Sequence, residues 1–153
     1  MTIEQFCAEM DDISGRFDSE SAHEPLEKCK PLVLHDIGQN FERSENADGV
    51  PWKPRKNIGD GHPLLLDTHA LGEAAAGQGA GHIESVGPRD LTLGVDGSVI
   101  EYANIHNEGG ETGRPGARFI MPQREYERAT ETTLDECEEI IADDMLAKFW
   151  KDY

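Results

Sequence analysis

Apolar residues recur at helical intervals in the first third of the chain. Thr2 and Gln5 have the spacing of a capping box, and the apolar positions that follow predict a short amphipathic helix within residues 1–20, ending near Gly15. A second stripe predicts a helix from about Glu24 to Arg43, in which Pro31 is expected to cause a kink or to delay the start. The two stripes consist of Ile3, Phe6, Cys7, Met10 and Ile13, and of Leu26, Cys29, Leu32, Val33, Ile37 and Phe41.

The C-terminal part has the clearest helical pattern. Its apolar stripe is Tyr126, Ala129, Thr133, Leu134, Cys137, Ile140, Ile141, Met145 and Phe149, with acidic residues on the other faces. Pro122 suits a first helical turn, where a missing N–H costs nothing. The pattern therefore predicts a long helix over 122–150, about 43 Å at 1.5 Å per residue, which favours packing beyond one subunit.

Short segments between these helices have the character of strands. Alternation and β-branched residues over His82–Val86 and Leu91–Val95, separated by the turn residues 87–90, predict a β-hairpin. A further short strand is expected over Phe119–Met121. The predicted fold class is α+β, with a small antiparallel β-sheet packed against helices and a long C-terminal helix.

Two segments have the composition of loops. Residues 44–63 are rich in Asp, Asn, Gly and Pro, and residues 72–82 are mostly small, so both are predicted to be loops, the second one flexible. Between them, Leu64, Leu65, Leu66, Ala70 and Leu71 predict a short buried element. Trp52 lies in the first loop and is expected either to cap the core, which is favoured, or to anchor a partner.

Length and charge limit the classes of function. A chain of 153 residues suits a single domain, 1–153. It has 31 acidic and 14 basic residues, a net charge of −17, which argues against binding to nucleic acid phosphates. The three cysteines are widely spaced and favour reduced thiols in the cytosol. Because no signal peptide and no apolar run of about 20 residues is evident, we expect a soluble protein that does not enter a membrane.

No recognisable catalytic arrangement is present in the sequence. The six histidines form no HxxxH or HExxH pair, and the abundant carboxylates are typical of solvated helix faces. A Cys–His nucleophile is disfavoured because Cys7 and Cys137 lie on apolar stripes, where thiols are usually inert. We therefore expect no catalytic, cofactor-binding or metal-binding residues, no cofactor, and no enzymatic activity.

The segment YANIHNEGG, residues 102–110, stands out as a candidate docking corner. It joins the end of an expected strand to an aromatic residue, a histidine and two glycines. Gly109 and Gly110 can adopt backbone angles closed to other residues, so the chain can turn sharply after His106. His106 is interpreted as a structural residue of this corner.

Four segments, in this order along the chain, resemble those of a known family. They are NFERSENADGVPW at 40–52, LLLDTHAL at 64–71, LTLGVDGSVIEYANIHNEGG at 91–110 and RPGARFIMP at 114–122. Together they resemble the bacteriophage virion morphogenesis family, which comprises tail completion proteins of Mu-like and P2-like phages. One position departs from the family pattern L-x-T-G-x-L, since His69 stands where the family usually has glycine. The family-like positions are Asp48, Gly49, Trp52, Leu66, Leu71, Tyr102, Ala103, His106, Gly109, Gly110, Ala117, Arg118 and Phe119.

The resemblance implies a structural role in the virion. Copies of the chain would form a ring, with a hexamer expected, that joins the tail to the filled head beside neck, tail terminator or head-completion proteins. DNA would pass through the lumen without specific binding, and the subunit would reside in the host cytoplasm during assembly. The interface candidates are Trp52, Tyr102, His106, Gly109, Gly110, Arg118 and Phe119. Trp52→Ala is predicted to weaken incorporation into particles more than it weakens the soluble subunit.

The acidity leaves two further questions open. Acidic faces could flank the DNA passage and repel it, or the charge could merely keep the free subunit soluble. An alternative function is an acidic DNA mimic that inhibits or regulates a DNA-binding enzyme. A metal-dependent hydrolase that uses the histidines ranks last.

Overall fold

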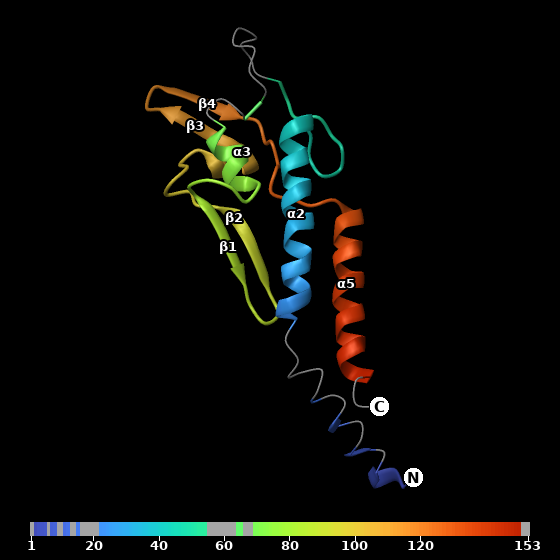
Figure 1. The fold of residues 1–153 in the computed structure, drawn as a ribbon. Helices are drawn as coiled ribbons and strands as arrows, with labels where there is room; N and C mark the ends of the chain where they lie inside the picture. The colour runs from blue at the N-terminus through green and yellow to red at the C-terminus, as the bar shows by residue number, and fades with distance from the viewer. Residues whose placement is uncertain are drawn as a thin grey trace.

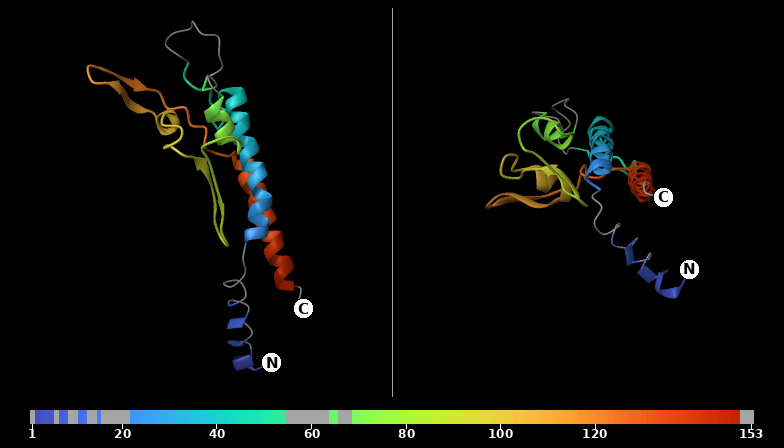
Figure 2. Two further views of the ribbon diagram at one scale, coloured as in Figure 1. Left: turned by 60° about the vertical axis from the view of Figure 1, so that its left-hand side comes forward. Right: turned by 60° about the horizontal axis from the view of Figure 1, so that its bottom comes forward.

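Two long antiparallel helices form one side of the molecule (Figures 1 and 2). They are α2 (His23–Arg43) and α5 (Glu131–Trp150), and two β-hairpins and two short helices lie on the other side of α2. The computed structural model describes residues 22–54, 64–65 and 69–150, together with 2–5, 7–8, 11–12 and 15. The arrangement confirms the α+β class.

Helix α2 follows the predicted stripe but begins at His23, so Pro31 does not delay its start. Cys29, Ile37 and Phe41 are buried on one face, whereas Pro31 is exposed. Proline has no N–H to donate to the carbonyl four residues earlier in the helix, and on the exposed side water can donate to that carbonyl instead. The helix ends at Arg43 and is capped by Ser44, whose left-handed backbone directs its N–H back toward the last helical turn.

Helix α5 begins nine residues later than predicted, because the segment before it is held in an irregular conformation by contacts distant in sequence. The Asn107 carboxamide oxygen accepts the N–H groups of Tyr126 and Glu127 at 3.0 and 3.2 Å. The buried Asn40 amide donates to the carbonyls of Tyr126 and Arg128 at 3.1 and 2.9 Å. These bonds satisfy backbone groups that a helix over 122–130 would have used itself, so the C-terminal helix is confirmed over 131–150 but its predicted start at 122 was wrong.

The start of α5 is fixed by Thr130. Its hydroxyl accepts the N–H of Thr133 at 3.2 Å, the geometry of an N-terminal cap. The Thr130 N–H and hydroxyl both donate to Asp36 of α2 at 2.8 Å. Burial alone would raise the pKa of Asp36, but hydrogen bonds from Thr130 and Thr133 outweigh it and lower that pKa.

The described strands form two antiparallel hairpins. The predicted pair, β1 (His82–Val86) and β2 (Leu91–Val95), has the expected bounds, with His82 opposite Val95 and Val86 opposite Leu91. Lys30 ties this hairpin to α2 through Glu84 at 2.7 Å. The second hairpin joins β3 (Gly110–Arg114) and β4 (Ala117–Met121). Strand β4 contains the strand expected at 119–121, whereas β3 was not predicted.

Part of the predicted 72–82 loop is helical. Helix α3 (Ala70–Ala75) buries Leu71, Ala74 and Ala75, and residues 76–81 form turns. The end of α3 packs against α2, since a Cβ at Gly38 would lie in ordinary van der Waals contact, 3.7 Å from that of the capping residue Ala76. The small side chains therefore serve close packing of helices in this part of the segment, not flexibility.

The core centres on three aromatic rings from separate parts of the chain. Phe41 contacts Trp52 edge-on at 5.6 Å and Tyr126 at 5.0 Å, measured between ring centroids. Trp52 is 6% exposed, and its Nε1–H donates to the Glu125 carbonyl at 3.1 Å. The core-capping interpretation of Trp52 therefore holds. The rest of this cluster comprises Ile37, Leu71, Ala74, Ala75, Val95, Ile100 and Ala103.

The N-terminal expectations are met in part. The capping box exists, with Thr2 and Gln5 exchanging hydrogen bonds of 2.8 and 3.2 Å, and the described residues from 3 to 15 are helical. Cys7 is exposed, so its expected place on a buried stripe was wrong. Residues 16–20 of the expected helix and 55–63 of the 44–63 loop lie outside the described residues; residues 44–54 form turns and extended backbone.

Candidate functional site

The glycine corner is built around a short helix that the sequence did not predict. Helix α4 (Ala103–Glu108) replaces the expected strand end, and the chain then turns through Gly109 and Gly110, with φ of 73° and 127°. A Cβ on Gly109 would lie only 2.7 Å from the Gln123 backbone nitrogen. Glycine is therefore required here for both backbone angle and space, as the sharp-turn interpretation expected.

His106 and Tyr102 lie together on this corner. Their rings meet edge-on with centroids 5.8 Å apart, and Tyr102 is 42% exposed. The His106 carbonyl accepts the Arg124 N–H at 2.8 Å, which links α4 to the segment after β4. The ring contact and this backbone hydrogen bond place His106 where α4 meets the segment after β4, and its interpretation as a structural residue stays a prediction.

Two residues at this junction were missed by sequence reasoning. Asn107 receives the two backbone N–H groups described above, and the Arg124 side chain is 5% exposed and donates from Nε to the Lys53 carbonyl at 3.1 Å. Their partners lie 19 to 71 residues away in sequence. No local periodicity could have identified them.

The β3–β4 hairpin projects away from the body of the molecule and is here called the arm, residues 110–121 (Figure 2). Nearly all of its residues are exposed, including Phe119 at 46% and Ile120 at 67%. Neighbouring residues of a strand point to opposite faces, so both faces of the arm present an apolar side chain. A two-stranded hairpin is marginal in water by itself, which makes the arm a candidate for contact with another molecule.

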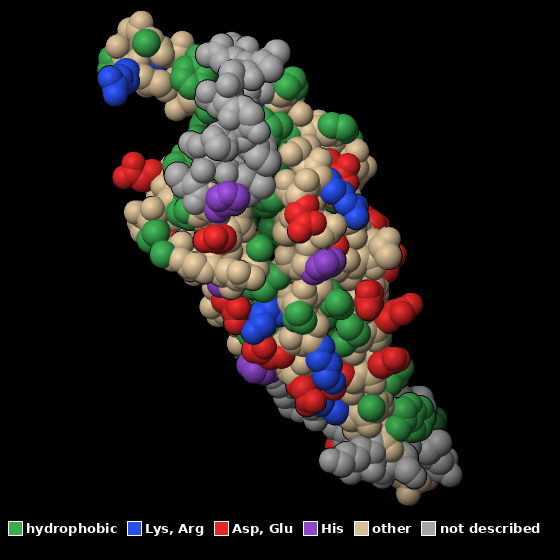
Figure 3. Space-filling model, turned by 45° about the horizontal axis from the view of Figure 1, so that its top comes forward, with side chains coloured by type: hydrophobic (Ala, Val, Ile, Leu, Met, Phe, Trp, Pro, Cys, Tyr) green, Lys and Arg blue, Asp and Glu red, His purple; other side chains and the backbone are tan. Residues whose placement is uncertain are grey.

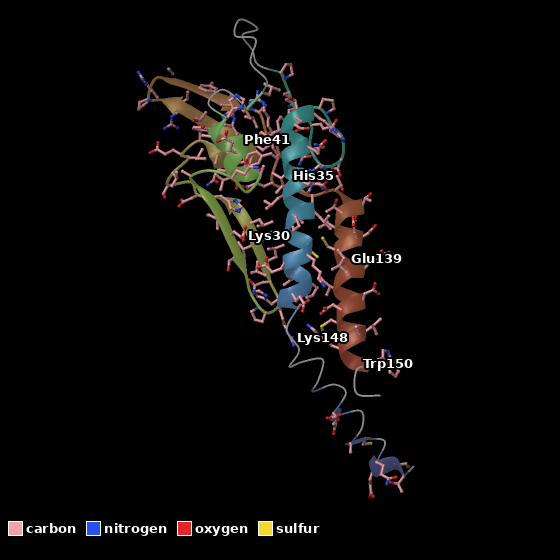
Figure 4. The ribbon with its side chains drawn as sticks, viewed as in Figure 1. Lys30, His35, Phe41, Glu139, Lys148 and Trp150 are labelled. Atoms are coloured by element: carbon pink, nitrogen blue, oxygen red, sulfur yellow. The ribbon has the colours of Figure 1, made fainter. Side chains whose placement is uncertain are left out.

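Charge differs between the arm and the outer helix. The arm has Arg114 and Arg118 against Glu111, and Arg118 pairs with Glu111 at 3.4 Å. Arg114 is exposed and has no ion-pair partner among the residues that the structure describes. Helix α5 contains seven acidic residues and one lysine, and carboxylates are spread along the helices in Figure 3. Glu139 and Trp150 lie on the side of α5 away from α2 (Figure 4).

A polar pocket of about 590 Å³ lies where α2, the 44–49 turns and the start of α5 meet. Asp36 and Thr130 line it and are engaged in capping α5, while Arg128 pairs with Asp48. Within the described residues, no three His, Cys, Asp or Glu side chains are grouped to hold a metal ion. The hydrogen bonds and ion pair of these pocket residues therefore stabilise the local fold.

The two buried thiols lie between the long helices. Cys29 Sγ donates weakly to the Cys137 carbonyl at 3.7 Å. Burial, followed by the neighbouring Cys29 thiol, raises the pKa of Cys137 to about 12. Such a thiol is protonated and unreactive at neutral pH, as the sequence pattern indicated.

The predicted interface residues separate into two groups. Tyr102, His106, Gly109 and Gly110 form the corner from which the arm starts, and Arg118 and Phe119 lie on the arm. Trp52 belongs to neither group, because it is buried in the core. The corner and arm therefore constitute the candidate functional site.

Comparison with known proteins identifies a family. The model of the phage virion morphogenesis family matches residues 32–146, which include the core, the corner, the arm and most of α5. No curated protein and no solved structure matches the chain. None of the helices in the described part is both long and apolar enough to span a membrane.

Proposed function

Because the chain belongs to the phage virion morphogenesis family, we propose that it is a tail completion protein that joins the tail to the filled head. The family itself gives the chain a structural or assembly role in the virion. The finer assignment makes it a ring-forming subunit, with a hexamer expected, at the head–tail junction. Its neighbours there would be neck, tail terminator or head-completion proteins.

The observation that carries this proposal is the exposed arm. A hairpin that leaves Phe119 and Ile120 in water, in a family of virion assembly proteins, supports a subunit that is completed by its neighbours. The role is one of binding, without catalysis or a cofactor. The corner sets the direction in which the arm leaves the body, because Gly109 allows β3 to leave α4 against the backbone at Gln123.

The proposed relation to DNA is passage without specific contact. The net charge of −17 disfavours binding to phosphates and would limit adhesion of the genome to a surrounding ring. A map of the assembled ring with a basic lumen would contradict this part of the proposal.

The experiment is a deletion of the gene in its phage, complemented by the full-length chain. Deletion is expected to leave filled heads separate from completed tails, and complementation to restore joined particles that contain the protein stoichiometrically. Joined, infectious particles without the protein would refute the proposal.

The second candidate function, an acidic DNA mimic, is favoured only by the carboxylates of α5. In that case the protein would be absent from purified particles and would instead inhibit a DNA-binding enzyme in a manner that added DNA relieves. The particle composition thus separates the two functions.

A further inference from the structure

We propose that the arm of one subunit docks onto the outward face of α5 in a second copy of the chain, as the contact that closes the ring. This inference rests on the proposed function and names the surfaces that would build the ring. It gives each subunit two different contact faces, the arrangement that identical subunits need to form a closed ring.

The first support is the position of the two surfaces. The arm and α5 lie on opposite sides of the molecule in every view of Figures 1 and 2. The arm of a subunit therefore cannot contact α5 of the same subunit. The arm of a neighbour related by rotation can contact it.

The second support is the pattern of side chains on α5. Cys137 faces α2 and is buried, and Leu146, nine residues and two and a half turns later, lies on the opposite side. Asp135, Glu139, Ala142, Leu146 and Trp150 recur every three or four residues along that side, and all are exposed. This outward stripe is acidic in its first half and apolar in its second, with Leu146 49% and Trp150 61% exposed.

The third support is complementarity with one face of the arm. Phe119 pairs with Thr112 across the hairpin, so Arg114 lies on the same face as Phe119, diagonally about 7–8 Å away. On α5, Ala142 and Leu146 lie about 4.5 and 10.5 Å beyond Glu139 along the axis. The distance of about 7–8 Å between Arg114 and Phe119 on the arm lies between these two distances on α5. The Arg114 guanidinium can reach Glu139 while the Phe119 ring covers Ala142 and Leu146.

The residue types fit an interface centre. Arginine and aromatic side chains are enriched among residues that dominate binding energy. Arg114 is available for such a contact, since its charge has no ion-pair partner among the described residues. The chain as a whole has a strong excess of acidic residues. The arm of a second copy offers a cation beside an apolar ring, and α5 presents carboxylates beside apolar side chains, so the two surfaces are complementary.

The test uses two variants of the full-length chain, each defective in one surface. The arm variant is Arg114→Glu with Phe119→Ser, and the α5 variant is Glu139→Arg with Leu146→Ser. Each is expected to weaken self-association, measured by sedimentation velocity, by about 30-fold or more. Mixed together, they are expected to form a one-to-one dimer, because one variant retains an intact α5 and the other an intact arm. Thermal melts confirm that both variants fold.

Controls distinguish this contact from others. Val50→Ser changes a similarly exposed apolar residue at 57% exposure and is expected to leave association unchanged, as is Ile120→Ser on the opposite face of the arm. Loss of association from Ile120→Ser but not from the arm variant overturns the assignment. A mixture that stays monomeric, or a wild-type chain that never self-associates, overturns it as well.

A photoreactive residue at position 119 tests the same contact in the particle. Cross-links are expected to residues 131–150 of another copy. Particles that contain the protein but show cross-links elsewhere overturn the inference and leave the proposed function standing. Absence of the protein from the particles refutes the proposed function.

Discussion

Replacement of Trp52 by alanine is expected to destabilise the folded subunit strongly. The indole ring is 6% exposed, contacts Phe41 edge-on at 5.6 Å, and donates its N–H to the Glu125 carbonyl. Removal of the ring leaves a cavity between α2 and the segment that leads to α5. It also removes the donor that satisfies a carbonyl beside Tyr126.

The burial of the Trp52 ring sets the expected loss of folding free energy. Truncation of a buried tryptophan costs about 3–5 kcal/mol, a large part of the 5–15 kcal/mol that stabilises a typical domain. For a chain of this length, that loss lowers the melting temperature by about 6–20 °C. This expectation reverses the prediction made from the sequence, in which Trp52→Ala would affect incorporation into particles more than it affects the fold.

Thermal unfolding followed by far-ultraviolet circular dichroism measures the effect. The matched control is Trp150→Ala, because Trp150 is the other tryptophan and is 61% exposed, and its change is expected to stay within about 0.5 kcal/mol. Trp52→Phe keeps a ring against Phe41 but loses the N–H donor, so about 1–2 kcal/mol is expected. The reasoning is refuted if Trp52→Ala melts within about 2 °C of the wild type.

Three other substitutions test local features of the fold. Gly109→Ala should cost at least about 1 kcal/mol more than Gly49→Ala, because both have φ of 73° but only Gly109 lacks space for a Cβ; equal melting temperatures would contradict this. The pKa of Asp36 is lowered in the folded chain, so its contribution is complete above the unfolded value of 3.8 and is lost as the pH falls through the lower folded value. Urea unfolding of the wild type and Asp36→Asn should therefore differ at neutral pH and converge in acid, and a constant difference would argue against the Thr130 contact. His69→Gly should stabilise by about 0.5–1 kcal/mol in thermal melts, since His69 has φ of 58°, whereas a variant that melts below the wild type would contradict a net gain from relief of backbone strain there.

The His69 prediction also explains a departure from the family pattern. The position precedes α3 with a left-handed backbone, which glycine adopts without a steric penalty. The left-handed backbone of His69 gives a physical reason why glycine would suit this position, as the sequence resemblance leads us to expect.

Local patterns determined the elements whose contacts are close in sequence. The alternation at 82–86 and 91–95 and the turn between them predicted the bounds of the first hairpin, because its pairing partners lie within 13 residues of each other. The stripe of α2 predicted its buried face, and the capping box at Thr2 is present. The double glycine predicted the corner because its backbone angles are a local property.

Tertiary contacts decided the features that depend on residues far apart in the sequence. Tyr126 and Ala129 continue the apolar period of α5, yet they lie outside the helix, because Asn40 and Asn107 bind the backbone around Tyr126 across 86 and 19 residues of sequence. Small residues that resemble a flexible linker form α3, whose Leu71, Ala74 and Ala75 are buried in the core. The sequence by itself determined which segments are periodic, acidic or able to turn. The tertiary structure decided where α5 begins, that Trp52 is buried and that the arm is exposed, because each depends on contacts between residues far apart in the chain.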